Sequence, residues 1–189
     1  MKRIFDIIFS SISIVFLLPI MIFILIIIIF ECKAWPIYWT KRVGRMNKHF
    51  YMPKFRTMKP DTPMLDTENF LNNYDVNQYI TRSGLFLRKT SLDEIPQFFS
   101  VLIGRMSIVG PRPALFTQDD LIKLRTKKDI HLLLPGITGL AQINGRDNLS
   151  IEEKSNYDYE YLTNKSFFYD IKIVLLTIVR IFNFKMASH

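Results

Sequence analysis

The chain has 189 residues, which suits one domain with its own hydrophobic core and excludes a large multidomain assembly. Hydrophobic residues make up 49% of the chain and charged residues 22%, so a disordered chain is excluded. The formal net charge of +8 favours an anionic partner such as a phosphorylated substrate, an acidic lipid or nucleic acid. Because the chain has one cysteine and three scattered histidines, an internal disulfide and a structural zinc site are also excluded.

An apolar segment near the N-terminus, residues 4–30, is longer than a helix needs to be to cross a bilayer. Basic residues flank it on both sides, beginning with Lys2 and Arg3 before it and Lys33 after it. The positive-inside tendency would keep both flanks in the cytoplasm. Pro19 lies mid-segment, where the missing N–H favours a bend. The pattern leaves two alternatives open, a re-entrant membrane helix and a kinked single-pass helix, of which the single-pass helix is the commoner in general.

Two short strands are predicted after this segment. The ranges Ile37–Thr40 and His49–Phe55 are rich in aromatic and β-branched residues and are separated by Gly44–Lys48, which indicates a β-hairpin. The surrounding range 32–59 carries eight basic residues and no acidic one. Residues 61–79 are polar, with Pro60 just before them and Pro63 within them, which predicts a surface loop.

The central part of the chain predicts one helix over Ser91–Ile103. Ser91 and Glu94 have the spacing of a capping box, and Gly104 supplies a stop. Pro96 removes one backbone donor, so an irregular first turn is expected.

The C-terminal part predicts a rigid elbow, two helices, a loop and an amphipathic segment. Their ranges are Gly110–Pro113 for the elbow, Gln118–Ile130 for a charged helix, Leu134–Arg146 for an irregular loop, Ser150–Leu162 for a helix with a second capping box, and Phe167–Phe184 for the amphipathic segment. Polar residues of the last segment fall within one arc of a helical wheel. This pattern suits a helix in the membrane interface and equally a helix that covers a soluble core.

A pair of adjacent carboxylates, Asp93 and Glu94, follows two cations, Arg88 and Lys89. Nearby cations and helix N–H groups favour the ionised carboxylate, which can then bind a divalent cation or act as a nucleophile. The alternative is an acidic pair that only caps a solvated helix.

Two further basic segments fit phosphate. Arg112 stands between two prolines, so its guanidinium is presented with little backbone freedom for bidentate contact with phosphate oxygens. The segment Lys54–Thr57 is either a second phosphate contact or a basic edge strand. Together with the apolar segment, these residues point to chemistry on a phosphorylated, lipid-linked substrate.

Four motifs in order resemble those of the bacterial sugar transferase family, the monotopic polyprenyl-phosphate phosphoglycosyl transferases. They are Lys54–Met58, Thr90–Gln97, Gly104–Pro113 and Pro135–Arg146, and the range 157–175 resembles the C-terminal part of the family. The resemblance covers nearly the whole chain.

The resemblance implies a mixed α/β, mainly helical fold in two parts. Residues 1–31 would form the re-entrant membrane helix, bent at Pro19. Residues 32–189 would form a small catalytic domain with a short β-hairpin and interfacial amphipathic helices, on the cytoplasmic face of the bacterial inner membrane.

The resemblance also implies a reaction. Asp93 would attack the β-phosphorus of a UDP-sugar, release UMP, and pass the sugar phosphate to undecaprenyl phosphate to initiate glycoconjugate assembly. Mg²⁺ would be held by Asp93 and Glu94, and Glu94 would alternatively act as a base. Arg88, Arg112 and Lys59 would bind substrate phosphate. The expected partners are UDP-sugar, undecaprenyl phosphate and membrane lipid, but not nucleic acid.

A contrasting hypothesis is a non-catalytic, membrane-attached basic module that binds anionic lipid or nucleic acid. It explains the charge and the apolar segment but not the carboxylate pair among arginines. Nucleic-acid binding is disfavoured because single-strand binding uses aromatic residues interleaved with basic ones, whereas most phenylalanines here lie in apolar runs.

Overall fold

The computed structural model describes residues 1–62, 76–145 and 148–182. Outside the described residues lie most of the predicted loop over 61–79, Arg146, and residues 183 and 184 at the end of the amphipathic segment. The fold is mixed α/β and mainly helical, as predicted. The α-helices are α1 (Lys2–Cys32), α3 (Val76–Tyr79), α4 (Arg82–Thr90), α5 (Gln97–Leu102), α6 (Asp119–Lys127), α7 (Leu140–Ile143), α8 (Ile151–Asn164) and α9 (Phe167–Phe182). The 3₁₀ turns are η1 (Arg45–Asn47), η2 (Leu92–Glu94) and η3 (Ile130–Leu132). The strands are β1 (Ile37–Val43), β2 (His49–Phe55), β3 (Ser107–Val109), β4 (Ala114–Leu115) and β5 (Gly136–Thr138).

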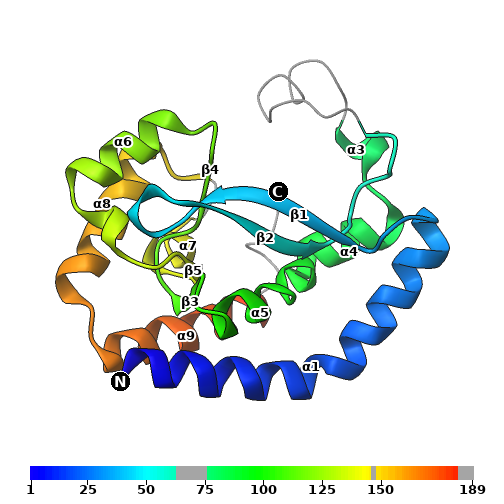
Figure 1. Cartoon of the computed structure of the whole chain (residues 1–189), viewed down its shortest axis with the longest axis horizontal. Coiled ribbons are helices and arrows are strands. Elements are labelled where there is room, and N and C mark those ends of the chain that lie inside the picture. The colour runs from blue at the N-terminus through cyan, green and yellow to red at the C-terminus, as the bar shows by residue number, and fades with distance from the viewer. Residues whose placement is uncertain (63–75, 146–147, 183–189) are drawn as a thin grey trace.

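The N-terminal apolar segment forms the 31-residue helix α1, which contains Pro19. Figure 1 shows α1 as two arms that meet at a bend, wrapped along one side of the molecule. The first arm packs Phe5 and Phe9 against the main core, and the second arm buries Ile24 and Ile28 against the hairpin end and α4. Both arms of α1 therefore pack against the same domain.

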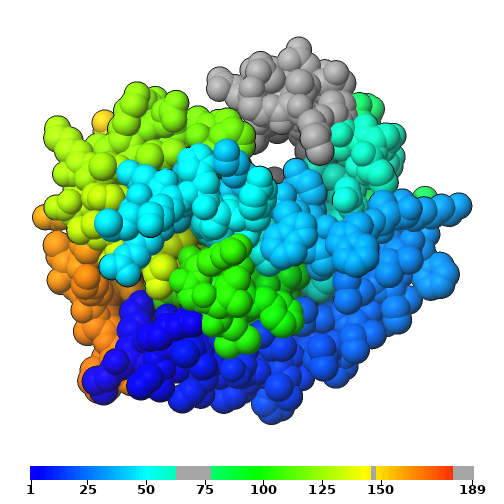
Figure 2. All heavy atoms as spheres, in the orientation of Figure 1, coloured from blue at the N-terminus to red at the C-terminus, as the bar shows by residue number. Residues whose placement is uncertain are grey.

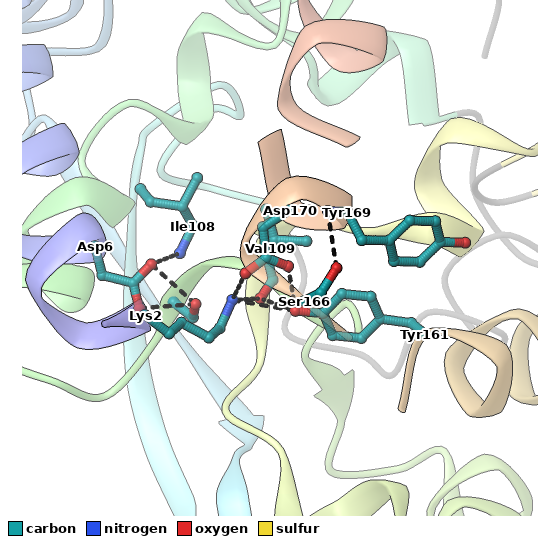
Figure 3. Close-up of polar contacts among 9 residues, drawn as sticks. Lys2, Asp6, Ile108, Val109, Tyr161, Ser166, Tyr169 and Asp170 are labelled. Atoms are coloured by element: carbon teal, nitrogen blue, oxygen red, sulfur yellow. Dashed lines mark hydrogen bonds and ion pairs between the residues drawn. The ribbon is translucent and has the colours of Figure 1, made fainter. Parts of the chain in front are cut away.

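A buried carboxylate fixes the first arm of α1. Asp6 is 1% exposed and accepts hydrogen bonds from the backbone N–H of Ile108, at 2.9 Å, and from the hydroxyl of Ser107, at 2.9 and 3.0 Å. Figure 3 shows this carboxylate directed at β3. The contact spans about a hundred residues of sequence, so it ties the start of α1 to the interior of the domain.

A second polar contact lies one turn earlier on α1. The Lys2 ammonium donates to the Asp170 carboxylate at 2.6 Å, to the Val109 carbonyl at 3.0 Å and to the Tyr161 hydroxyl at 3.1 Å (Figure 3). Tyr161 in turn donates to Asp170 at 2.6 Å, and burial, with the nearby charge of Asp170, raises the pKa of the Tyr161 hydroxyl. The helices α1, α8 and α9 thus meet through one polar network.

The predicted β-hairpin is confirmed, with its first strand extended to Val43. Strands β1 and β2 pair antiparallel from Ile37 opposite Phe55 to Val43 opposite His49, and β4 adds a short third strand beside β1. Figure 2 shows the hairpin across one face of the molecule, with α1 along the edge below it.

The predicted irregular loop over Leu134–Arg146 is wrong over residues 136–143, which form a strand and a short helix. Gly136–Thr138 forms β5, which pairs parallel with β3, and α7 follows. The glycines that suggested a loop are required by close packing, since a Cβ on Gly136 or Gly139 would come within 2.1 Å of the Gly110 backbone. From the sequence alone, glycines that allow two backbones to pack closely cannot be told apart from glycines that form a turn.

The two C-terminal helices follow their predicted ranges closely. At the start of α8 the capping box between Ser150 and Glu153 is confirmed. In α9 the polar Asp170 and Thr177 turn inward, where Thr177 bonds Thr138 at 2.7 Å. Several apolar residues of α9 are instead exposed, among them Phe168, Leu175, Leu176, Ile178 and Val179.

Apolar side chains are also exposed on neighbouring helices. They include Ile12, Val15, Phe16, Phe23 and Phe30 of α1, Leu85 and Phe86 of α4, Phe99 of α5, and Ile103 just after α5. An exposed apolar surface of this extent is typical of a protein that contacts a membrane or another protein. One described helix, α1, is long and apolar enough to cross a bilayer.

Candidate active site

Two carboxylates and two cations from different elements form a compact cluster. The Lys54 ammonium of β2 lies 2.8 Å from Oε1 of Glu94 and 3.5 Å from Oδ2 of Asp93. The Arg112 guanidinium, from the segment before β4, lies 3.2 Å from the same oxygen of Glu94. The structure thus brings together Asp93, Glu94 and Arg112, and places beside them Lys54, from the basic segment that the sequence analysis offered as a second phosphate contact.

Burial makes these charges interact strongly. Asp93 and Glu94 are each 8% exposed, and Lys54 and Arg112 are only partly exposed. Removing water lowers the local dielectric, so each carboxylate depends on its cations to stay ionised. An incoming anion would find two cations already held in place at the edge of the cluster.

Arg88 also lies beside this cluster. Its Nε donates to the Thr57 hydroxyl at 2.8 Å, and Gly84 lets α4 approach, since a Cβ there would lie 2.2 Å from the Thr57 carbonyl oxygen. Burial lowers the pKa of the Arg88 guanidinium, and the charge of Asp93 opposes that change. A guanidinium stays protonated even so, which leaves a fixed cation near Asp93.

The helix predicted to begin at Ser91 is wrong in its first part. Ser91 has left-handed backbone angles (φ 57°, ψ 17°) and ends α4, a helix that the sequence analysis does not predict. A single 3₁₀ turn follows and carries Asp93 and Glu94, and α5 begins only after Pro96. The expected irregularity at Pro96 is confirmed, but the carboxylates owe their environment to neighbouring cations rather than to the start of a long helix.

Lys59 is the site candidate that the structure places differently. Its ammonium donates to the Gln78 carbonyl at 2.7 Å. It lines a surface hollow together with Glu31 and Cys32 at the end of α1 and with Arg82 at the start of α4. Lys59 therefore lies at this hollow, whereas Lys54 is the lysine that contacts Asp93 and Glu94.

A buried ion pair that the sequence pattern did not reveal supports Arg112. Arg125 of α6 donates to the Asp158 carboxylate of α8 at 2.6 and 2.9 Å, and its third contact, at 2.8 Å, is the backbone carbonyl of Arg112 itself. The backbone of the elbow is therefore fixed by the hydrogen bond from Arg125 as well as by Pro111 and Pro113. An arginine within a charged helix gives no sequence signal for such a role.

The protein could supply only some of the oxygen ligands that a magnesium ion needs. Among the described residues, no group of three or more His, Cys, Asp or Glu could hold a metal. Mg²⁺ is commonly bound through one or two carboxylates together with substrate phosphates and water. Asp93 and Glu94 match that pattern, because they are adjacent carboxylates in a cationic site suited to phosphate.

Comparison with known proteins gives a family match. The family model for bacterial sugar transferases matches residues 1–184. A UDP-glucose:undecaprenyl-phosphate glucose-1-phosphate transferase of Klebsiella pneumoniae is 37% identical over 98% of this chain and 41% of the relative. The sugar transferase EpsL of Bacillus subtilis, whose activity is uncharacterised, is 42% identical over 77% of this chain and 70% of EpsL.

A third relative is close to this chain in length. The exopolysaccharide production protein ExoY of Rhizobium meliloti is 33% identical over 94% of this chain and 83% of its own length. By contrast, the chain spans less than half of the Klebsiella relative. The match over nearly all 189 residues and the order of the four motifs agree, so this chain belongs to the bacterial sugar transferase family.

Proposed function

We propose that the protein is a phosphoglycosyl transferase that moves a sugar-1-phosphate from a UDP-sugar to undecaprenyl phosphate. The observation that carries this proposal is the Asp93–Glu94 pair, buried and in contact with Lys54 and Arg112. Relatives from Klebsiella pneumoniae and Escherichia coli that are named for this reaction with UDP-glucose support it. A lipid- or nucleic-acid-binding module would have no use for two buried carboxylates among its cations.

In the first step, an oxygen of the Asp93 carboxylate attacks the β-phosphorus of the UDP-sugar. A bond forms between Asp93 and that phosphorus, the bond from the phosphorus to the bridging oxygen breaks, and UMP leaves with the electron pair. Asp93 suits this role because the nearby cations favour its ionised form. Arg88 and Arg112 would hold phosphate oxygens and reduce the repulsion between two anions.

In the second step, a phosphate oxygen of undecaprenyl phosphate attacks the same phosphorus. The bond to Asp93 breaks, the carboxylate is restored, and undecaprenyl-diphosphate-sugar leaves. A phosphate monoester is largely ionised at neutral pH, so it needs little help from a base. Asp93 and Glu94 would hold Mg²⁺, which would neutralise phosphate charge.

We also infer a monotopic placement on the cytoplasmic face of the inner membrane. Both arms of α1 pack on one domain, and Lys2 and Asp6 bond to its interior. A helix that crossed the bilayer would have to break one set of these contacts. The exposed apolar residues of α1, α5 and α9 would then enter one leaflet. This placement would hold the site at the membrane surface, where the acceptor lipid lies.

The test is a half-reaction without acceptor. The purified enzyme, given Mg²⁺ and each of a panel of UDP-sugars, should release at most about one UMP per active site and gain the mass of a phosphosugar on the peptide with Asp93. D93N should lose both signals, while D120N, at an exposed carboxylate of α6, should keep them. Excess EDTA should stop UMP release.

Three results would contradict parts of the proposal. No UMP release from any UDP-sugar would remove the proposed activity. Release that requires bound acceptor would replace the covalent intermediate by direct transfer. Full turnover in EDTA would remove the metal.

A further inference from the structure

The strand register places an aromatic ring on the face of the hairpin that carries Lys54. Tyr38 of β1 lies directly opposite Lys54 of β2. Residues directly opposite in an antiparallel pair project from the same face, with Cβ atoms about 5 Å apart. Lys54 reaches Glu94 and Asp93 from this face, so Tyr38 lies one side chain away from the carboxylate cluster.

The ring of Tyr38 is accessible and has a cationic neighbour. It is 44% exposed, and the guanidinium carbon of Arg56 lies 5.8 Å from the ring centroid. Arg56 is itself oriented by a 2.8 Å hydrogen bond from its Nε to the Trp35 carbonyl. A planar ring flanked by lysine and arginine offers both a stacking surface and neutralisation of phosphate charge.

The same face of β1 continues toward Arg112. Thr40 and Arg42 follow Tyr38 at two-residue spacing, and Arg42 contacts both the Thr40 hydroxyl and the Pro113 carbonyl at 3.4 Å. This row of side chains therefore extends from the aromatic ring to the segment that presents Arg112. It borders the carboxylate cluster along one side.

We propose that Tyr38 stacks on the uracil base of the nucleotide sugar, a role that rests on the proposed function and extends it to donor recognition. The sugar is bonded directly to the phosphate that Asp93 attacks, whereas the base is farther away, beyond the second phosphate and the ribose. Tyr38 is separated from Asp93 by the length of the Lys54 side chain, which suits the more distant group. Base stacking on an aromatic ring is sequence-tolerant and geometrically undemanding, so an exposed ring can perform it.

The experiment compares UMP, which has the base, the ribose and one phosphate but not the transferred sugar, with the UDP-sugar. In detergent-solubilised full-length protein, Y38A should raise the Kd of UMP and the KM of the UDP-sugar together, by roughly 5- to 100-fold. Because Y38F keeps the ring, it should stay near wild type. Y51A is the matched control, since Tyr51 is an exposed tyrosine on the opposite face of the same hairpin. Equal thermal unfolding midpoints would show that the variants are folded.

Other outcomes overturn the inference and are distinct from failure of the function. If Y38A raises the KM of the UDP-sugar and leaves UMP binding unchanged, the ring contacts the sugar instead. If Y38A changes only binding to lipid vesicles, the ring is an interfacial anchor. If wild type neither binds UMP nor releases it, the proposed function itself fails.

Discussion

Replacing Asp6 tests whether the start of the membrane helix is fastened to the catalytic domain. In D6A the backbone N–H of Ile108 and the hydroxyl of Ser107 lose their common acceptor. Ile108 is 3% exposed and Ser107 is fully buried, so water cannot replace the carboxylate without rearrangement of the core. The unsatisfied groups should destabilise the fold, and the first arm of α1 should loosen.

The magnitude follows from the number and kind of bonds lost. Two donors bond to one ionised acceptor at 2.9–3.0 Å. Hydrogen bonds to charged groups contribute about 1.5–3 kcal/mol each, so D6A should cost about 3–5 kcal/mol. For a chain of this length that corresponds to an unfolding midpoint that is lower by about 6–20 °C. D6N keeps one carbonyl acceptor and should cost less.

The assay is thermal unfolding of the detergent-solubilised protein, followed by intrinsic fluorescence. A double-mutant cycle with S107A isolates the interaction, and the two substitutions should be non-additive by about 1–3 kcal/mol because they share one contact. E152A, at an exposed carboxylate of α8, is the control and should change stability by no more than about 0.5 kcal/mol.

An additive cycle would refute the reasoning, because it would mean that Asp6 and Ser107 do not stabilise each other in the folded protein. So would a D6A midpoint equal to that of E152A. A large loss in D6A with retained additivity would assign the effect to some other part of the helix.

Three further predictions concern the bend, the phosphate contact and a helix cap. P19A should straighten α1 and move some molecules into a membrane-spanning orientation, which labelling of a cysteine placed ahead of Met1 from the periplasmic side of intact cells would detect; unchanged labelling would mean that other contacts set the bend. R112K should lower kcat/KM for the UDP-sugar by about tenfold or more, since lysine lacks the bidentate fork, and wild-type kinetics would show that Arg112 does not contact phosphate. Hydrogen bonds from Ser150 lower the pKa of Glu153, so the stability they contribute is present above the ordinary glutamate pKa and is lost as the pH falls through the lower folded value. The main donor to this carboxylate is the backbone N–H of Ser150, which a substitution of Ser150 would keep, so the test variant changes Glu153 itself. E153Q should destabilise the protein at pH 7, and its difference from wild type should narrow below about pH 4; an equal difference at both pH values would contradict a role for the carboxylate.

The sequence by itself determined the features that depend on near neighbours. The apolar run produced α1, the alternating aromatic and β-branched residues produced the hairpin, and the S-x-x-E spacing produced the α8 cap. These patterns are local because helix and strand periodicities repeat within a few residues. The residue types of the candidate site, Asp93 and Glu94 among cations, were also visible in the sequence.

Tertiary structure decided the contacts between distant segments. Lys54 meets Glu94 across forty residues, Asp6 meets Ile108 across about a hundred, and Arg125 reaches the carbonyl of Arg112 only because α6 and α8 pack together. Such pairings depend on how whole helices and strands pack together, which cannot be predicted from a short stretch of sequence. The same holds for Ser91, whose spacing to Glu94 predicted the start of a helix. In the structure Ser91 instead ends α4 in a left-handed conformation, and the carboxylates that follow contact Lys54 of β2 and Arg112 of the elbow.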